Sequence, residues 1–372
     1  MAVLHFPGKL AIQQRVLPTY RASFFDALAQ ACDGGLNVCA GLPRSEESIA
    51  VTNSLQVAHY YYAGNLHFFH GPFYVCFQRD LTGWLSACDP DALILEANPR
   101  YLATSAAIRW MKHRNRPVLG WGLGAPSSSH SIHLAGKWGQ ARREGFLRQF
   151  DALLTYSRRG AEEYAALGFP ADKIFVAPNA AVARPTWPVP SRTPAFIGKP
   201  TILFVGRLQA RKRVDLLLQA CAALPENLQP RLIVVGDGPE RDSLQAMAKV
   251  LYPSAEFSGA KHGAELVPIL SAADLFVLPG TGGLAVQEAM SYGLPVVMGQ
   301  GDGTNDDLVR SENGWQVPAD DLPALTATLR LALADASRLR AMGAESYRIV
   351  SDEINIGVMV RVFVETLTRL CK

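Results

Sequence analysis

Short apolar runs alternate with longer segments of helical period along most of the chain. Residues 91–96 read Asp-Ala-Leu-Ile-Leu-Glu and residues 274–279 read Asp-Leu-Phe-Val-Leu-Pro, and a segment that predicts a helix follows each run. Continuous apolar runs of about four to eight residues are typical of strands buried on both faces of a parallel sheet. Alternation of such strands with helices predicts an α/β protein made of doubly wound, Rossmann-like parallel sheets.

The length of the chain and one proline-rich stretch predict two domains. The chain has 372 residues, and a single hydrophobic core rarely extends beyond about 250 to 300 residues. Residues 184–200 are rich in proline and have no strand or helix period, which is typical of a linker. We therefore predict an N-terminal domain over 1–184, a linker over 185–199, a C-terminal domain over 200–353 and a final helix within 354–372.

Composition predicts a globular protein and argues against several classes. Apolar residues make up 49% of the chain and charged residues 19%, and no apolar run approaches the roughly 20 residues that cross a bilayer. The first residues lack the basic start and long apolar core of a secretory signal. Six cysteines without a CxxC pair or metal spacing favour a reduced, cytoplasmic protein. The aromatic residues within 59–77 have no Lys or Arg between them, so nucleic acid is not an expected partner.

Charge is distributed unevenly between the two halves. Residues 1–198 contain 19 Lys and Arg against 13 Asp and Glu, a net charge of +6, and residues 199–372 contain 17 against 20, a net charge of −3. A basic cluster in the predicted helix over 102–113 and its tail contains Arg109, Lys112, Arg114 and Arg116 beside Trp110 and Met111. Such a surface suits an anionic membrane or a phosphorylated acceptor, and an ordinary solvated surface is the alternative.

The segment around Leu284 is the clearest candidate for a binding site. An apolar strand ends in a stretch that contains Gly280, Gly282 and Gly283, and a short helix begins at Leu284. Glycines let a backbone approach a ligand closely, and unpaired amides at a helix N-terminus attract an anion. Glu288, about one turn into the helix, would reach hydroxyl groups attached to that anion. The combination suits a sugar nucleotide, with the diphosphate on the amides and the ribose on Glu288; an ordinary strand-turn-helix corner is the alternative.

Two cations follow another buried strand. The run Thr-Ile-Leu-Phe-Val-Gly leads directly to Arg207, and Lys212 comes five residues later. Two cations at the carboxyl end of a parallel strand can neutralise a departing diphosphate without a bound metal. No Asp-x-Asp stands at a suitable strand end, and only the acidic cluster beginning at Asp302 argues otherwise. We therefore expect neither a metal nor another cofactor.

These motifs resemble those of a known family. Gly-Arg-Leu-x-x-x-Lys and Gly-Leu-Ala-Val-Gln-Glu-Ala-Met-Ser-Tyr-Gly-Leu-Pro-Val-Val are similar to the phosphate-clamp and donor-site motifs of retaining GT-B glycosyltransferases of family 4. The resemblance implies two Rossmann-like domains with a cleft between them, a last helix that packs back on the N-terminal domain, and a nucleotide-sugar donor. In that family two glutamates stand eight residues apart. Here Glu288 matches the second, and Gly280 occupies the place of the first.

The resemblance also implies roles for individual residues. Arg207 and Lys212 would be catalytic because they stabilise the leaving group, and Lys261 lies near the loop that touches the nucleobase in relatives. The donor-binding residues implied in this way are Gly206, Arg207, Lys212, Lys261, Gly282, Gly283, Leu284 and Glu288.

Candidates for contact with the acceptor come from the N-terminal domain. Glu96, Asn98 and Arg100 follow a predicted buried strand, and the carboxyl ends of parallel strands line ligand sites. Arg21 stands at a predicted helix N-terminus, where a cation is disfavoured unless it serves an anion; a surface ion pair is the alternative. The aromatic segment 59–77 predicts strands or an edge hairpin, either as a wall of the acceptor site or as plain packing.

Relatives often place a histidine, facing the reacting sugar, soon after the strand that here precedes Leu123. Leu123 occupies the nearest position, and His130 and His133 come later. His130 is therefore the third catalytic candidate, ahead of His133. A solvated loop histidine is the alternative.

We predict a retaining, metal-independent hexosyltransferase that transfers a sugar from a nucleotide-sugar donor to a glycan or lipid-linked acceptor in polysaccharide or glycoconjugate biosynthesis. It would act in the cytoplasm, with peripheral attachment to the inner face of the cell membrane as a further expectation. Two alternatives stay open at this point. One is a nucleotide-sugar 2-epimerase, and the other is a non-catalytic GT-B-like subunit that binds nucleotide-sugars, which Gly280 favours.

Overall fold

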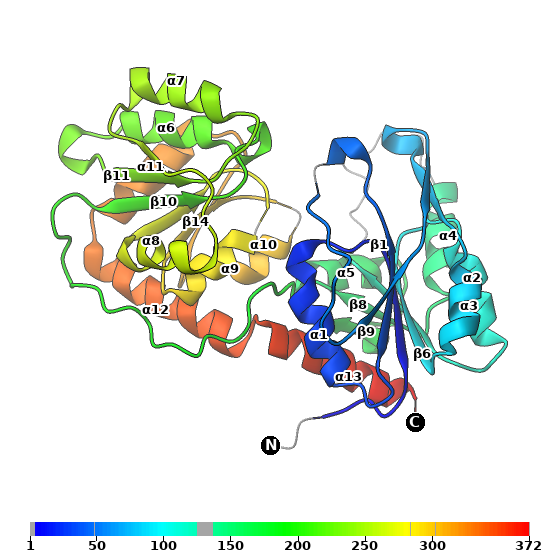
Figure 1. Cartoon of the computed structure of the whole chain (residues 1–372). Helices are drawn as coiled ribbons and strands as arrows, with labels where there is room; N and C mark the ends of the chain where they lie inside the picture. Colours follow the sequence, from blue (N-terminus) through cyan, green and yellow to red (C-terminus); the bar gives the residue numbers. More distant parts are fainter. Residues whose placement is uncertain (1–3, 48, 125–136, 283, 302, 372) are drawn as a thin grey trace. The chain divides into compact units, whose positions relative to one another are not determined.

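The computed structural model describes residues 4–47, 49–124, 137–282, 284–301 and 303–371 (Figure 1). The chain forms two compact units: the first contains residues 1–181 and 356–372, and the second contains residues 182–355. Each unit is built on one parallel sheet with helices packed against it. The predicted fold class, two Rossmann-like parallel-sheet domains, is confirmed.

The first unit contains a seven-stranded parallel sheet in the order β3-β2-β1-β6-β7-β8-β9. Its strands are β1 (Leu10–Val16), β2 (Leu36–Gly41), β3 (His59–Tyr62), β6 (Ala92–Glu96), β7 (Val118–Gly122), β8 (Ala152–Thr155) and β9 (Ile174–Val176). The strand order runs outward from β1 in one direction and from β6 in the other. The neighbours β1 and β6 therefore form the switch point of the sheet, where ligands bind beyond the carboxyl ends of the strands.

Helices cover both faces of this sheet. The side chains of alternate residues of β1 pack in the two cores on opposite faces of the sheet. Leu10 and Ile12 pack with residues of α1 and α13. Ala11 packs with residues of α2 and α3. The helices are α1 (Ala22–Gln30), α2 (Leu81–Cys88), α3 (Thr104–Lys112), α4 (Lys137–Leu147), α5 (Arg158–Ala166) and α13 (Ile356–Leu370).

The last helix, α13, belongs to the first unit although it follows the second unit in sequence. Phe363 of α13 packs edge-on against Trp121 of β7, with ring centroids 5.0 Å apart, and against Phe24 of α1 at 5.1 Å. All three rings are buried. The apolar face of the last helix therefore completes the core of the first unit.

The aromatic segment after β2 contains both an edge strand and a separate hairpin. Strand β3 lies parallel to β2 at the edge of the sheet. Strands β4 (Asn65–Phe68) and β5 (Val75–Gln78) form a two-stranded antiparallel ribbon. The tip between them contains the turn η3 (Gly71–Phe73).

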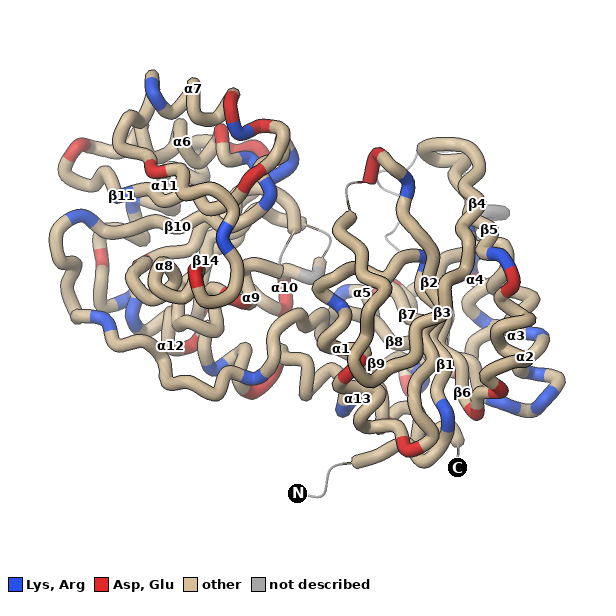
Figure 2. The backbone as a smooth tube through the Cα atoms, viewed as in Figure 1, with Lys and Arg blue, Asp and Glu red and all other residues tan. Residues whose placement is uncertain are grey.

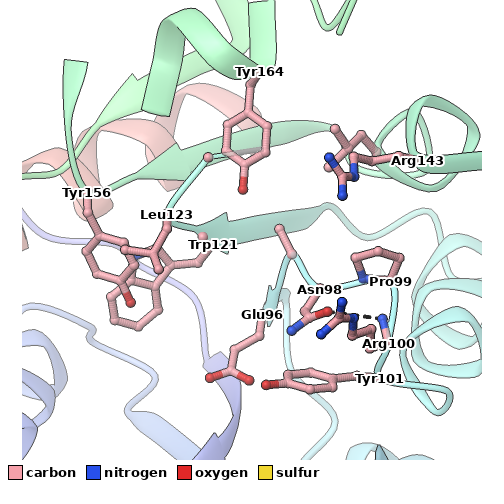
Figure 3. A pocket seen from close by; sticks show the side chains of 14 residues that line it. Glu96, Asn98, Pro99, Arg100, Tyr101, Trp121, Leu123, Arg143, Tyr156 and Tyr164 are labelled. Atoms are coloured by element: carbon pink, nitrogen blue, oxygen red, sulfur yellow. Dashed lines mark hydrogen bonds between the residues drawn. The ribbon is translucent and has the colours of Figure 1, made fainter. Parts of the chain in front are cut away.

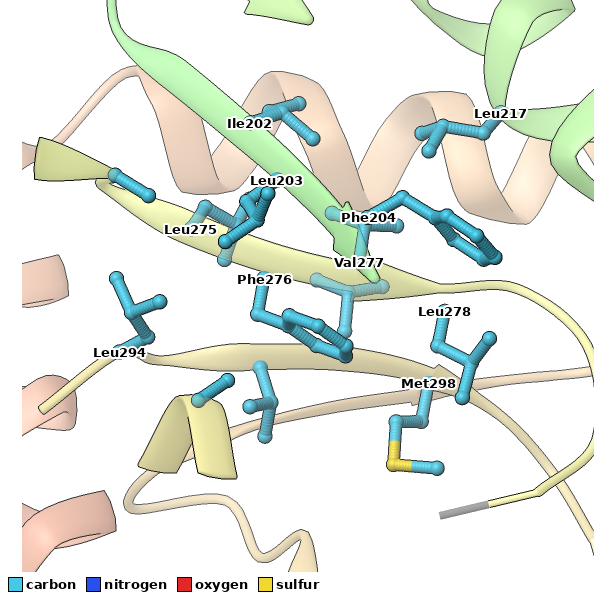
Figure 4. Close-up of a cluster of buried hydrophobic side chains, with 14 of the residues drawn as sticks. Ile202, Leu203, Phe204, Leu217, Leu275, Phe276, Val277, Leu278, Leu294 and Met298 are labelled. Carbon is cyan, nitrogen blue, oxygen red and sulfur yellow. The ribbon is translucent and has the colours of Figure 1, made fainter. Parts of the chain in front are cut away.

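The second unit is built on a six-stranded parallel sheet in the order β12-β11-β10-β13-β14-β15. Its strands are β10 (Thr201–Val205), β11 (Arg231–Val235), β12 (Glu256–Phe257), β13 (Leu275–Leu278), β14 (Val296–Gly299) and β15 (Gly314–Val317). The side chains of Phe204, Phe276 and Met298, from β10, β13 and β14, fill the core (Figure 4). Because these strands are covered on both faces, their sequences are continuously apolar.

The helices of the second unit pack against this sheet, and short turns connect the elements of both units. The helices are α6 (Val214–Ala222), α7 (Arg241–Leu251), α8 (Val267–Ala272), α9 (Leu284–Ser291), α10 (Thr304–Leu308), α11 (Leu322–Leu333) and α12 (Ala336–Asp352). The other short 3-10 turns are η1 (Thr19–Arg21), η2 (Ser45–Glu47), η4 (Ala171–Lys173), η5 (Ala210–Lys212), η6 (Glu226–Leu228) and η7 (Gly263–Glu265).

The proline-rich segment predicted as a linker over 185–199 is bound along the second unit. Arg192 donates hydrogen bonds to the carbonyl oxygens of Leu270 at 2.9 Å and Ala273 at 2.8 Å, at the end of α8. It also donates to those of Tyr292 at 3.0 Å and Gly293 at 3.2 Å, just after α9. One guanidinium thus satisfies carbonyl groups that two helix ends leave without partners.

Replacing Arg192 by Leu should therefore destabilise the second unit, because several carbonyl groups lose a charged donor at once. We expect a loss of about 2 to 4 kcal/mol in the free energy of unfolding, measured by denaturant titration. Arg184, whose ion pair with Asp352 is exposed, provides the control: Arg184→Leu should change stability by less than about 1 kcal/mol. Equal effects of the two substitutions would contradict this role of Arg192.

Candidate functional site

Lys212 lies at the end of η5, between β10 and α6. Its ammonium nitrogen Nζ donates a hydrogen bond to the carbonyl oxygen of Thr281 at 2.8 Å. Burial, together with the neighbouring Arg211 guanidinium, lowers the pKa of Lys212 to about 8. The side chain is therefore still mostly cationic at neutral pH, and it lies where the neighbouring strands β10 and β13 end.

The loop that follows β13 packs directly on the loop that follows β10. The Thr281 amide donates to the carbonyl oxygen of Arg211 at 3.0 Å, in addition to the bond from Lys212. A Cβ at Gly280 would overlap that Arg211 oxygen and lie 2.6 Å from the Lys212 Cα. A Cβ at Gly282, whose φ is +105°, would overlap Lys212 Nζ. The two glycines therefore permit the backbone contact that holds Lys212 in place.

The close packing of these two loops explains why residue 280 is a glycine. A residue with a side chain, including the glutamate that the family pattern places here, would collide with the backbone at Arg211 and Lys212 unless one of the two loops moved. The departure from the family pattern is thus tied to how closely these two loops approach. It is not by itself a sign of a degenerate site.

Arg207 is exposed directly after β10, in a loop that also contacts the loop after β11. The Leu208 amide donates to the carbonyl oxygen of Asp237 at 2.9 Å. A Cβ at Gly236, whose φ is +147°, would overlap the Gly206 carbonyl oxygen. The backbone on both sides of Arg207 is therefore fixed, while its side chain faces solvent.

Glu288 is half-buried on α9. Burial raises the pKa of its carboxyl group, and the nearby His262 opposes this effect. Lys261 precedes His262 in the loop after β12. The side chain of Glu288 thus lies within electrostatic reach of the loop that the resemblance assigns to the nucleobase.

The predicted donor residues are therefore located as follows. Gly206, Arg207 and Lys212 follow β10; Gly282, Leu284 and Glu288 follow β13; and Lys261 follows β12. Gly283, whose amide was a candidate phosphate ligand, lies outside the described residues, as does Asp302. Within the described residues, no group of three or more His, Cys, Asp or Glu side chains could hold a metal ion. The role of each donor residue stays a prediction.

A pocket of about 370 Å³ lies at the carboxyl ends of β6 and β7 in the first unit (Figure 3). Its lining includes three of the predicted acceptor residues, Glu96, Asn98 and Arg100. The full lining consists of Glu96, Ala97, Asn98, Pro99, Arg100, Tyr101, Trp121, Gly122, Leu123, Gly124, Arg143, Leu147, Tyr156 and Tyr164. The pocket is next to the switch point of the sheet, where a ligand site is expected.

Glu96 ends β6, beside β1. Its Oε2 accepts a hydrogen bond from the Arg15 amide at 3.1 Å, and the Tyr101 hydroxyl points toward its carboxylate (Figure 3). Burial raises the pKa of Glu96 to about 7, and the hydrogen bonds from Arg15 and Tyr101 limit the rise. Because both charge states are populated near neutral pH, this carboxyl group can accept a hydrogen bond from a sugar hydroxyl or donate one to it.

Trp121 was not predicted as a site residue. Its ring is buried in the pocket wall, and its indole Nε1 has no hydrogen-bond partner among the described residues. This N–H is shielded from solvent, so Trp121 contributes its ring to the pocket wall. The only signal in the sequence is Gly-Trp-Gly at the end of β7, because an aromatic residue in a strand usually indicates core packing.

Arg21, a candidate for contact with the acceptor or for a surface ion pair, is buried rather than on the surface. The side chain is 4% exposed, and its guanidinium donates to the carbonyl oxygen of Ala180 at 3.2 Å and to Asn179 Oδ1. Its guanidinium carbon lies 5.4 Å from the centre of the Trp121 ring. Arg21 is therefore a structural cation of the core. The sequence does not show that the carbonyl groups after β9 pack against α1.

The two candidate histidines, His130 and His133, lie outside the described residues. Leu123, at the nearest position after β7, is 50% exposed and lines the pocket. The first unit therefore places a leucine, rather than a histidine, at this point of the pocket.

Two of the four cations of the predicted basic cluster on α3 and its tail form ion pairs. Figure 2 marks the positions of the Lys, Arg, Asp and Glu residues along the backbone. Lys112 pairs with Asp151, and Arg116 pairs with Asp89. The Arg114 guanidinium stacks on the Trp110 ring, with 3.7 Å between the guanidinium carbon and the ring centre. Met111, expected beside a lipid layer, is fully buried in the core. Two of the four basic residues of this surface are therefore held in ion pairs, and the exposed methionine that the membrane prediction assumed is absent.

None of the described helices combines the length and the apolar composition that a membrane span requires.

Comparison with known proteins connects these sites to a family. Residues 190–349 match the family described as Glycosyl transferases group 1. A GDP-mannose-dependent alpha-mannosyltransferase of Mycobacterium tuberculosis is 37% identical over 169 residues, and the match covers 42% of this chain and 42% of that protein. The lipopolysaccharide core biosynthesis glycosyltransferase LpsE of Rhizobium meliloti is 24% identical over 285 residues, covering 72% of this chain and 83% of that protein.

Solved structures resemble the chain over nearly its whole length. HepE of Anabaena in complex with UDP has a TM-score of 0.69 and 16% identity, covering 97% of this chain and 99% of that chain. The apo form of the lipopolysaccharide outer core galactosyltransferase WaaB has a TM-score of 0.67 and 17% identity, with the same coverage. The fold is therefore the two-domain GT-B fold of glycosyltransferases. The part of the chain that is similar to the glycosyl transferases group 1 family, residues 190–349, makes up most of the second unit.

Gly280→Ala should disturb the second unit, because its Cβ would overlap the Arg211 carbonyl oxygen. We expect a loss of about 1 to 3 kcal/mol in the free energy of unfolding, measured by denaturant titration. The control is Gly145→Ala on α4, where a Cβ would meet no atom within 4 Å; it should be neutral or stabilise by up to about 1 kcal/mol. Unchanged stability of the Gly280 variant would show that the loops approach less closely.

Proposed function

We propose that the protein is a glycosyltransferase that transfers a sugar from a nucleotide-sugar donor to a hydroxyl group of an acceptor. The observation that carries this proposal is the hydrogen bond that holds the Lys212 ammonium between the ends of β10 and β13. Similar proteins support it: a relative depends on GDP-mannose, and HepE has been solved with UDP and with UDP-glucose. GDP-mannose and UDP-glucose are therefore the first donors to test.

The proposed chemistry is the loss of a nucleoside diphosphate from the donor. The bond between the sugar carbon and the diphosphate oxygen breaks, and the leaving diphosphate keeps the electron pair. The oxygen of the acceptor hydroxyl group bonds to that carbon, and the hydroxyl proton passes to the departing diphosphate. Arg207 and Lys212 stabilise the departing negative charge, and the backbone at Gly282 and Leu284 approaches the phosphates. Glu288 would bind the ribose, and Lys261 the region of the nucleobase. We further propose that the reaction retains the anomeric configuration and requires no metal, because cations of the protein already neutralise the leaving group.

The acceptor side of the proposal rests on the pocket of the first unit. Glu96 supplies a carboxyl group that can accept a hydrogen bond from a sugar hydroxyl or donate one to it. Arg100 and Arg143 line the same pocket and suit a phosphate or carboxylate on the acceptor. A glycan or a lipid-linked glycan fits this chemistry. Several similar proteins are described by their part in lipopolysaccharide or colanic acid biosynthesis, which supports a role in making polysaccharides or glycoconjugates.

The proposed location is the cytoplasm, with peripheral attachment to an anionic membrane surface. A net charge of +6 on the first unit supports this, since that unit contains 20 Lys and Arg against 14 Asp and Glu. The two alternative functions gain no such support. The similar proteins named above are transferases rather than 2-epimerases, and the loop packing at Gly280 weakens the case for a non-catalytic subunit.

Lys212→Ala should lower kcat/KM for the best donor by about 30- to 1,000-fold, because the departing diphosphate loses a cation. The measurement is release of nucleoside diphosphate from a panel of nucleotide-sugars. Lys199, exposed in the proline-rich segment, provides the control, and Lys199→Ala should keep full activity. Wild-type turnover in the Lys212 variant would remove the leaving-group role.

The pH profile distinguishes this cationic role from a structural one. Because the lowered pKa of Lys212 is about 8, the required cation is present below that pH and is lost as the pH rises through it. Activity should fall above about pH 8 in the wild type, and Lys212→Arg should move that fall to higher pH if it retains turnover.

Chelation by EDTA should leave most of the activity intact, because Arg207 and Lys212 replace a metal at the diphosphate. The measurement is the rate of nucleoside diphosphate release before and after dialysis against EDTA, with added Mg²⁺ or Mn²⁺ as the control. Complete loss on chelation, restored by the added ion, would contradict the metal-independent mechanism.

A further inference from the structure

The β4–β5 hairpin has its apolar side chains on the outside. In its register Leu66 pairs with Phe77 and Phe68 with Val75, so these side chains share one face, and this face is partly or fully exposed. Phe68 is 43% and Phe77 is 40% exposed. Half-solvated antiparallel sheets normally point polar residues outward. The hairpin shows the reverse arrangement.

The opposite face of the hairpin carries polar groups that are used inside the unit. Asn65 Nδ2 donates to the carbonyl oxygen of Leu42 at 2.9 Å, and Gln78 is buried, where its Oε1 accepts from Gln13 Nε2 at 2.9 Å. His67 Nδ1 lies 3.0 Å from the Tyr74 hydroxyl. The inward orientation of the polar face is thus fixed by hydrogen bonds, and the apolar face cannot turn inward without breaking them.

The tip of the hairpin extends this apolar face. Phe69 is 70% exposed and Phe73 is 77% exposed. Phe69 has a φ of +60°, a left-handed conformation that is unfavourable for a large side chain, and its ring nevertheless faces solvent. Contiguous exposed aromatic groups of this kind mark interaction surfaces.

Two cations lie beside or directly after β5, and one of them, Arg100, also lines the acceptor pocket. The Cys76 amide of β5 donates to the Arg100 carbonyl oxygen at 2.9 Å, and the Leu102 amide donates to the Cys76 carbonyl oxygen at 2.9 Å. Arg79 follows β5. Arg79 and Arg100 are both exposed, and neither forms an ion pair within the described residues. The acid nearest in sequence to Arg79, Asp80, accepts from the Tyr61 hydroxyl at 2.8 Å.

We propose that the aromatic hairpin, defined as Leu66, Phe68, Phe69, Phe73, Val75 and Phe77, inserts into the interfacial layer of an anionic lipid bilayer. Aromatic side chains favour that layer, and the flanking arginines and the net charge of +6 complement anionic headgroups. The hairpin rather than α3 is the contact, because α3 has no exposed large apolar side chain comparable to Phe69 and Phe73. This membrane contact rests on the proposed function in one respect: the contact would bring the lipid-linked acceptor of the transferase to the Glu96 pocket.

Co-sedimentation with vesicles tests the proposal. Vesicles of phosphatidylcholine containing a minor fraction of phosphatidylglycerol should bind the full chain, and the double variant Phe69→Ser with Phe73→Ser should bind roughly tenfold or more weakly. Val250→Ser is the matched control, since Val250 is an exposed residue on α7, and it should bind as the wild type does. Absence of binding by the wild type at low salt would overturn the proposal.

Two further variants distinguish the hairpin from α3 and from a dimer contact. Changing Lys112, Arg114 and Arg116 to Gln should reduce binding far less than the hairpin variant does, and the opposite ranking would overturn the proposal in favour of α3. A Phe73→Trp reporter should be quenched by brominated lipids beyond the background of the native tryptophans. If the wild type is a dimer by light scattering and the hairpin variant is a monomer, the face binds a second copy of the chain instead.

The release of nucleoside diphosphate in the absence of an acceptor tests the transferase function separately from the membrane contact. The hairpin variant should retain this activity, because its changed side chains are exposed and belong to the first unit, whereas Lys212 belongs to the second. A variant that loses vesicle binding but keeps this activity supports the hairpin assignment. If the wild type has no transferase activity and still binds vesicles through the hairpin, the proposed function fails and the membrane contact stands.

Discussion

The contact between the loops after β10 and β13 is the constraint on which the candidate donor site depends. Two hydrogen bonds, from Lys212 to Thr281 and from Thr281 to Arg211, join the loops, and Gly280 leaves room for them. This contact buries Lys212 and lowers its pKa, so its position and its electrostatics have one cause. The central strands contribute indirectly to the position of Lys212. They are buried on both faces, and this fixes the points at which the two loops begin.

Pairing, rather than the number of charges, decides which cations can bind a ligand. Arg21, Lys112, Arg116 and Arg192 all have partners inside the protein, and Arg192 joins two helix ends. Arg207 faces solvent from a fixed backbone. A count of basic residues in one half of the sequence therefore overstates the charge available on any one helix. The excess of +6 on the first unit still attracts anions at long range.

Hydrophobic patterning predicts the fold because the parallel strands are covered on both faces and their sequences are continuously apolar. It also locates Glu96, because a polar residue that ends such a strand lies at the ligand-binding edge. Residues that contact each other in the fold often lie far apart in the sequence. This explains why the sequence does not show that Arg21 is buried or that Trp121 lines the pocket. The close approach at Gly280 was unpredictable for the same reason: the colliding atoms lie about 70 residues earlier in the chain.

The hairpin illustrates the same limit in another form. Alternation of polar and apolar residues in Asn65–Phe68 and Val75–Gln78 is visible in the sequence, and it predicts two faces without saying which one is outside. Burial of apolar area alone would turn Leu66, Phe68 and Phe77 inward. Gln13 and Leu42 supply hydrogen-bond partners for the polar face, and leaving Gln78 and Asn65 unpaired in the interior would be costly. The polar network therefore sets the orientation, and the apolar face remains available for a partner outside the chain.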